Sequence, residues 1–179
     1  MYALDPNAPS FQALRRLWEH DPEAQPLIAL ASALSRDSAL AGTATAILGT
    51  RIGDMVTADE LAGAVNETYP GAYSEAVANK IGRNAASTWT QAGHLAGRVT
   101  KTRVRVNPRP ASVAYALFLA SLEGREGELL FDALPVRAQD APPHALREVA
   151  RDAARRGWLD FRSIGGVTEV GFDYLVGSA

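Results

Sequence analysis

The sequence predicts a mainly α-helical protein with short β-hairpins, on three observations. Apolar residues recur at helical spacing over most of the chain, Gly and Pro interrupt them at short intervals, and two segments alternate as strands do. The same order of elements also occurs twice, over residues 38–106 and again over 111–175. This order is two helices, a longer helix, a Gly, an apolar residue and a β-ribbon.

Three helices followed by a two-stranded ribbon is the order of a winged helix-turn-helix. We therefore expect tandem winged helix-turn-helix-like modules preceded by N-terminal helices. The expected division is an N-terminal helical subdomain at 1–37, a first module at 38–110 and a second module at 111–179.

The N-terminal helices are predicted from apolar spacing. Ser10 is a candidate N-cap for a helix that ends before the Pro-containing segment DPEAQP at residues 21–26. A second helix is predicted over 27–37, and a weaker third helix begins at Ser38 and ends near Gly49.

The first module depends on its caps and on one alternating segment. Thr57 and Glu60 have the spacing of a capping box, which predicts a helix to about Thr68. The turn YPGAY follows, and the next helix is predicted over 74–92, ended by Gly93. Residues 98–106 alternate basic or polar with Val and Thr, as one arm of a hairpin does.

The second module repeats this order. An apolar helix from Ala111, a shorter helix at 126–134 and a helix from Pro143 to Arg156 are predicted. Residues 158–172 then alternate on both sides of a Gly-Gly pair, which indicates a β-hairpin.

Composition excludes several classes of site. The 179 residues include no Cys, so neither a disulfide framework nor a thiolate metal site can form. The three His residues lie far apart with no metal-ligand spacing, and phosphate-loop and nucleophile-elbow motifs are absent. No apolar run approaches the roughly 18 residues of a membrane span. We expect a cytoplasmic, non-enzymatic protein that has no metal or cofactor and does not enter the membrane.

The charge is segregated along the chain. The net charge of the chain is −2, yet residues 76–122 contain seven cations and no Asp or Glu. The remaining residues therefore carry a net charge of −9, from 11 basic and 20 acidic side chains. Such a segment predicts a surface that binds a polyanion. The cations are Lys80, Arg83, Arg98, Lys101, Arg103, Arg105 and Arg109.

The helix predicted at 74–92 is the candidate recognition helix. At 100° per residue, one face collects Val77, Ile81, Ala85, Thr88 and Ala92 and is expected to be buried. The opposite face carries Asn79, Arg83, Ala86 and Thr90, flanked by Lys80 and Ser87.

In a major groove, Arg can form hydrogen bonds with guanine and Asn with adenine. The basic segment after the helix is expected to contact DNA phosphates. The predicted DNA contacts are Asn79, Lys80, Arg83, Ser87, Thr90, Arg98, Lys101, Arg103, Arg105 and Arg109. Four alternatives stay open: RNA in place of DNA, a merely solvated face, a strip that docks on an acidic partner protein, and a transcriptional regulator.

The long helix of the second module has a different surface. Arg147, Arg151 and Arg155 share it with Glu148 and Asp152, and residues 111–179 net −3. Carboxylates there repel phosphate, so we expect helix-surface salt links, with this module packing on the first or on a partner. Trp89 and Trp158 adjoin apolar residues at helix ends and are expected in a core.

Two segments together resemble the BrxA family of bacteriophage-exclusion (BREX) systems. One is NKIGRNAASTWTQAGHLAGRVTKTRVRV, with an Arg-Asn pair in a long helix and a Gly-x-Leu-x-Gly-basic turn. The other is the ending ARRGWLDFRSIGGVTEVGF, where Gly-Trp-Leu leads to an Ile-Gly-Gly hairpin. The likeness covers most of the chain.

Members of that family are small, non-catalytic, mostly helical proteins that bind DNA within a larger anti-phage system. The resemblance implies a double-stranded DNA-binding component of a bacterial defence complex, with other proteins of that complex as partners. No site residue is taken from the resemblance.

Overall fold

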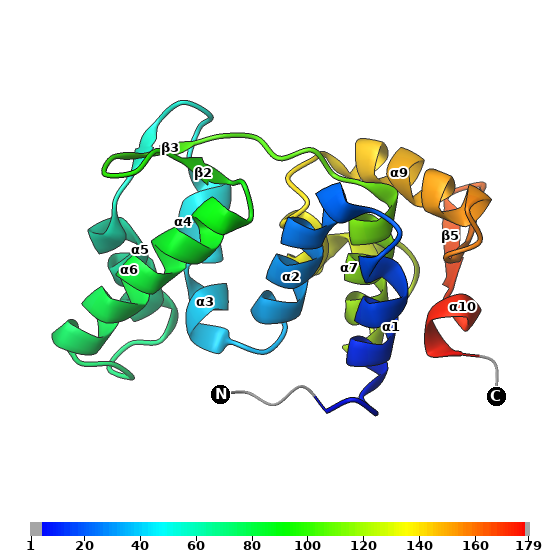
Figure 1. Cartoon of the computed structure of the whole chain (residues 1–179), viewed down its shortest axis with the longest axis horizontal. Helices are drawn as coiled ribbons and strands as arrows, with labels where there is room; N and C mark the ends of the chain where they lie inside the picture. The colour runs from blue at the N-terminus through cyan, green and yellow to red at the C-terminus, as the bar shows by residue number, and fades with distance from the viewer. Residues whose placement is uncertain (1–4, 178–179) are drawn as a thin grey trace. The chain divides into compact units, whose positions relative to one another are not determined.

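The computed structural model describes residues 5–177, which are mainly helical with small antiparallel sheets, as the sequence predicts (Figure 1). The chain divides into two compact units. One is Ala33–Val106, and the other joins the described residues up to Ser32 with those from Asn107 onward.

This division differs from the predicted boundaries at 1–37, 38–110 and 111–179. The first helices form no core of their own, because Ala13, Leu17 and Ile28 are buried in the same cluster as Tyr115 and Phe118. The apolar stripe of a short helix needs a partner to be stable, and here that partner comes from the second half of the chain.

The 33–106 unit has helices on one side of a small sheet. Its sheet is antiparallel with order β1-β3-β2, pairing Val56 with Lys101 and Leu95 with Arg103. The elements are α3 (Ser38–Gly42), α4 (Ala44–Gly49), β1 (Met55–Val56), α5 (Ala58–Thr68), α6 (Glu75–Gln91), β2 (Leu95–Ala96) and β3 (Lys101–Arg103).

Local sequence signals predicted α5 and α6, and the arm expected over 98–106 is a strand only at β3. Thr57 and Glu60 form the predicted capping box: the Thr57 hydroxyl accepts from the Glu60 amide at 3.2 Å, and the Thr57 amide donates to the Glu60 carboxylate at 2.7 Å. The helix expected over 38–49 is broken into α3 and α4 at Thr43. The Thr43 hydroxyl donates to the Leu40 carbonyl at 2.7 Å and accepts from the buried Trp89 indole at 2.8 Å. Strand β1, with two residues, is too short for its alternation to be visible in sequence.

The other unit is built around α7, whose residues 111–120 are all buried. An all-apolar helix of this kind lies inside its unit. The elements are α1 (Pro9–Trp18), η1 (Pro22–Ala24), α2 (Gln25–Leu34, ending past the unit boundary), α7 (Pro110–Leu122), η2 (Gly127–Asp132), α8 (Leu134–Arg137), α9 (Pro143–Arg155), β4 (Asp160–Ile164), β5 (Val167–Gly171) and α10 (Asp173–Val176).

Two details of this unit bear on the predictions. The hairpin is confirmed: Ile164 pairs with Val167 around Gly165 and Gly166, whose φ angles of 59° and 83° suit a two-residue turn. The single helix expected at 126–134 is instead the 3₁₀ helix η2 and the one-turn α8. Pro135 accounts for the break, because its ring excludes a continuous α-helix over the preceding turn.

Candidate nucleic-acid interface

Helices α5 and α6 pack so closely at Gly82 that no side chain larger than that of Gly fits between them. A Cβ at Gly82 would lie 2.1 Å from the Ala58 carbonyl oxygen and 3.0 Å from the Ala62 nitrogen, so only Gly fits. Small residues therefore form the contact between the two helices. The buried residues of α6 are Ala78, Gly82, Ala85, Ala86 and Trp89.

This packing corrects the predicted orientation of the helix. Val77, expected inside, is 45% exposed, and Ala86, expected outside, is 7% exposed. The prediction joined Val77 and Ile81 to later residues at i+4 and i+3 steps, whereas the contact uses Gly82 and neighbouring Ala residues. The signal that was missed is Gly82, a Gly inside a helical pattern that indicates close backbone packing.

Compared with the prediction, the exposed face of α6 is shifted around the helix by about one residue position. Lys80, Arg83 and Ser87, predicted contacts, are exposed, and Asn84 and Gln91, which were not predicted, join them.

Two other predicted contacts, Asn79 and Thr90, are half-buried. The Thr90 hydroxyl donates to the Ala86 carbonyl at 2.6 Å, so it is already occupied within the helix.

The ribbon after α6 has a tight turn. Gly97 has φ +103°, and a Cβ there would lie 2.0 Å from the Thr100 carbonyl oxygen. The turn exposes Arg98 and Val99, and Val99 is 92% exposed. The Lys101 ammonium donates to the Gly97 carbonyl at 2.7 Å and stays half-exposed.

A groove joins the ribbon to α6 within this unit. Arg83 of α6 and Lys101 of β3 both line it, although they are far apart along the chain. Its other lining residues are Met55, Val56, Thr57, Ala58, Ala86, Val99 and Thr100. The predicted helix and the predicted ribbon therefore share one concave surface.

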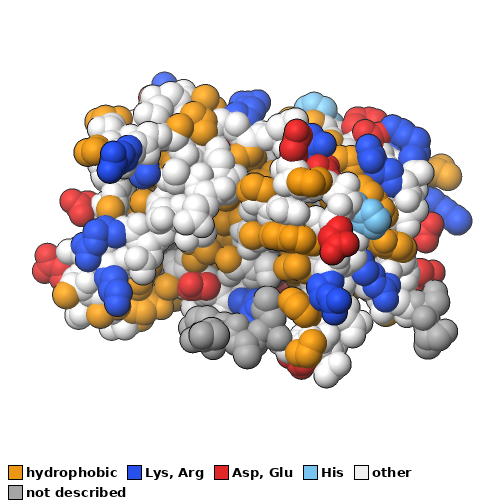
Figure 2. All heavy atoms as spheres, viewed as in Figure 1, with side chains coloured by type: hydrophobic (Ala, Val, Ile, Leu, Met, Phe, Trp, Pro, Cys, Tyr) orange, Lys and Arg blue, Asp and Glu red, His pale blue; other side chains and the backbone are white. Residues whose placement is uncertain are grey.

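The cations near this groove are not neutralised. Lys80, Arg83, Arg98, Lys101 and Arg105 make no ion pair among residues 5–177. The 33–106 unit has 8 basic and 6 acidic residues and a net charge of +2. The rest of the chain has 10 basic and 14 acidic residues and a net charge of −4. Figure 2 shows blue side chains over the region of α5, α6 and β3, with red ones near its outer margin.

The Glu60 carboxylate, in the first turn of α5, is engaged in a helix cap. Glu60 binds the Thr57 amide and also accepts from the Thr57 hydroxyl at 3.0 Å. Its charge therefore compensates the free amides at the start of α5. We define the α6–ribbon surface as the half-exposed Lys101 together with the exposed residues Lys80, Arg83, Asn84, Ser87, Gln91, Arg98 and Arg105.

Arg103, a predicted DNA contact, does not belong to this surface. It is 1% exposed, and its guanidinium donates to the carbonyls of Ile47 at 2.8 Å and His94 at 3.4 Å, and to that of Val104. The expectation was wrong because the carbonyl of Ile47 in α4 and that of His94 before β2 hold this guanidinium inside the unit. The sequence did not show that these carbonyls lie beside Arg103.

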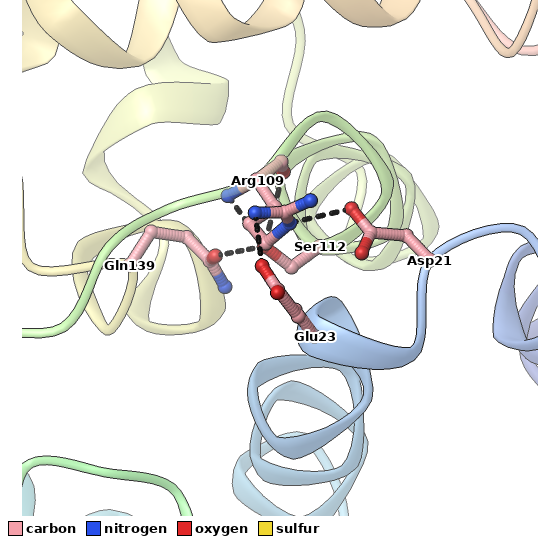
Figure 3. Close-up of polar contacts among 5 residues, drawn as sticks. All are labelled: Asp21, Glu23, Arg109, Ser112 and Gln139. Carbon is pink, nitrogen blue, oxygen red and sulfur yellow. Dashed lines mark hydrogen bonds and ion pairs between the residues drawn. The ribbon is translucent and has the colours of Figure 1, made fainter.

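Arg109, another predicted DNA contact, is not part of the α6–ribbon surface either. Its guanidinium pairs with Asp21 at 2.6 Å and Glu23 at 2.5 Å in the other unit (Figure 3). The hydrogen bond to Asp21 and the nearby carboxylates raise the pKa of Arg109 further above its usual range. Ser112 and Gln139 lie beside this group, with 2.7 Å between the Ser112 hydroxyl and the Gln139 amide oxygen. These carboxylates are remote in sequence, which is why the acid-free segment suggested a free Arg.

The helix α9 has the neutralised surface that the sequence predicts. Arg151 pairs with Glu148 and Arg155 with Asp152, each three residues apart. Arg147 pairs with Glu128 and lies over the Phe131 ring, 5.1 Å from its centroid. This face of α9 therefore offers little free positive charge to a polyanion.

Residues 5–177 contain no cluster of three His, Asp or Glu side chains suited to a metal ion. Within the same range, no helix is long and apolar enough to cross a membrane. Comparison with protein-family profiles, curated proteins and solved structures finds no match to this chain.

Proposed function

We propose that this protein is a non-enzymatic, double-stranded DNA-binding protein and that the α6–ribbon surface is its contact. The observation that carries the proposal is the groove in which Arg83 and Lys101 meet from different elements. Three more unpaired cations lie on the same helix and ribbon. Positive side chains that converge beside the exposed face of a helix favour a duplex as ligand.

The order of elements supports this proposal. In a winged helix, helices precede a recognition helix, a ribbon follows it, and the ribbon pairs with a short strand before the second helix. The 33–106 unit has this order, with α6 in the place of the recognition helix and the β2–β3 turn in the place of the wing. We therefore assign this unit as a winged helix-turn-helix, and we assign α7 to β5 as a second, degenerate copy.

The dimensions are compatible with a major groove. With 17 residues, α6 is about 25 Å long at 1.5 Å per residue. A major groove about 12 Å wide and about 8.5 Å deep admits one α-helix. In this arrangement α6 enters the major groove, and Arg98, Lys101 and Arg105 contact the backbone beside it.

Salt dependence tests the proposal. Neutralising four to six phosphates should give a plot of log affinity against log salt with a slope of about −4 to −5, at 0.9 per phosphate. Fluorescence anisotropy with a labelled duplex measures this slope. Affinity that is constant between low and moderate salt would overturn the proposal.

A matched pair of charge reversals localises the contact. Arg83→Glu should weaken duplex binding strongly, whereas Arg137→Glu, the same change at an exposed residue of the other unit, should have little effect. Equal losses for the two variants would show that the contact is not at α6.

One observation favours a second candidate, an adaptor that docks on an acidic protein. Met55 and Val99, which line the groove, are 62% and 92% exposed, and exposed apolar side chains beside cations suit a protein interface. A stoichiometric partner that survives nuclease treatment, together with no binding to any duplex, would select this function. A winged-helix transcriptional regulator would instead bind duplex and change expression of adjacent genes.

For the wider role we propose a component of a bacterial anti-phage defence complex, on the sequence resemblance to the BrxA family alone. Arg83→Glu in the host chromosome should then raise the plating efficiency of phages that the wild-type host resists. Unchanged resistance with a stable variant protein would separate DNA binding from defence.

A further inference from the structure

The α6–ribbon surface contains two chemically different parts. Arg83 and Lys101 both line the groove, so the groove side is cationic. Asn84, Ser87 and Gln91 lie on the exposed side of α6 and carry no charge.

The three uncharged residues form a single strip. At 100° per residue, positions 84, 87 and 91 fall within about 60° of each other around the helix. From 84 to 91 the strip is about 10 Å long, at 1.5 Å per residue. This length matches about three base pairs at 3.4 Å each.

The side chains of the strip have free hydrogen-bonding groups. The Asn84 amide makes no side-chain hydrogen bond within the described part of the chain. The Gln91 amide lies 3.5 Å from the Ser87 hydroxyl, at the limit of a hydrogen bond.

Neutral amides gain little from phosphate charge, but each has a donor and an acceptor side by side. In the major groove, adenine presents N6 and N7 in the matching arrangement, and Asn or Gln can bond both. An amide strip beside a cationic groove therefore separates base reading from backbone binding.

We infer that duplex binding by this protein is sequence-selective and that Asn84 and Gln91 each read an adenine in the major groove. Arg83 and Lys101 bind phosphates along the groove of the protein that they line. Lys80 adds positive charge one helical turn before the strip. This inference rests on the proposed DNA-binding function.

Selection from a randomised duplex library, followed by sequencing, tests the inference. The wild-type protein should enrich a motif with adenines at two positions about three base pairs apart. Asn84→Ala and Gln91→Ala should each lose the preference at one position. A bidentate contact discriminates by about 1–3 kcal/mol, so the affinity ratio at that position should fall by about 5- to 150-fold.

Asn66→Ala is the matched control, because Asn66 is an exposed Asn on α5 of the same unit and does not line the groove. It should select the wild-type motif. Circular dichroism of all three variants should equal that of the wild type, since each change is at an exposed side chain.

The outcomes separate the two proposals. If the wild type binds duplexes in a salt-dependent manner but enriches no motif, DNA binding stands and base reading by α6 is overturned. The same conclusion follows if Asn84→Ala and Gln91→Ala select the motif that Asn66→Ala selects. If no duplex is bound at all, the proposed function fails, and the inference fails with it.

Discussion

The guanidinium of Arg103 donates a hydrogen bond to the backbone carbonyl of Ile47, 56 residues earlier, at 2.8 Å. This bond connects the middle strand of the sheet to the end of α4. A cation from the basic segment thereby becomes part of the core of the 33–106 unit, and the neighbouring Arg105 stays exposed.

Arg103→Ala should lower the free energy of unfolding by about 3 kcal/mol, because buried carbonyl acceptors lose their donor and a cavity remains. Urea unfolding followed by circular dichroism measures this change. Arg105→Ala is the control and should change stability by less than about 0.5 kcal/mol, while weakening duplex binding. Equal stability of the two variants would contradict the buried role of Arg103.

Gly82→Ala should destabilise the protein by about 3 kcal/mol, because the new methyl group would meet the Ala58 carbonyl at 2.1 Å and force α5 and α6 apart. Thermal unfolding measures the effect. Gly63→Ala on α5 meets no atom within 4 Å and should stabilise by about 0.5–1 kcal/mol through helix propensity. If both substitutions stabilise the protein, the close α5–α6 contact is absent.

Arg109→Ala should leave the salt slope of duplex binding unchanged, because Asp21 and Glu23 already neutralise this guanidinium. Lys101→Ala, which removes a cation with no ion pair, should reduce the magnitude of the slope by about 0.9. Anisotropy titrations at several salt concentrations compare the two variants. A reduced slope for Arg109→Ala would mean that the ion pair opens on binding.

Glu128→Gln should destabilise the protein at neutral pH, and the destabilisation should shrink as the pH falls below the unfolded-state pKa of Glu128. The hydrogen bond from Arg147, and then that from Thr168, lowers the pKa of Glu128 from its usual 4.5. A lowered folded-state pKa stabilises the fold above the unfolded pKa, and this contribution disappears as the pH falls through the folded pKa. Urea unfolding at pH 7 and pH 3 measures the difference.

The control for this change is Glu126→Gln, since Glu126 is exposed and makes no ion pair in the described residues. Its stability difference from the wild type should be small at both pH values. A deficit of Glu128→Gln that persists undiminished at pH 3 would exclude the Glu128 charge as its source.

Local chemistry made several features predictable from sequence. The capping box of Thr57 and Glu60, the Gly165-Gly166 turn and the burial of Trp89 all depend on residues close in the chain or on large apolar side chains. The ion pairs along α9 were predictable for the same reason, because their partners are one helical turn apart.

The candidate surface was predictable only in part. The acid-free segment identified Lys80, Arg83 and Lys101, but the rotation of α6 was misjudged because Gly82 forms the helix contact. As a result, Asn84 and Gln91 were missed.

The sequence by itself determined that the chain is mainly helical, where the capping box and the hairpin turn lie and where cations accumulate, because these depend on backbone propensity and charge within a few residues. It did not fix every helix start: Ser10, the expected N-cap, lies inside α1, which begins at Pro9. Only the tertiary structure decided which cations are free. Arg103 is buried and bonded to the Ile47 carbonyl, 56 residues before it, and Arg109 pairs with carboxylates that lie more than 80 residues before it. The physical reason is that burial and ion pairing depend on distance in space, which chain folding sets independently of distance in sequence.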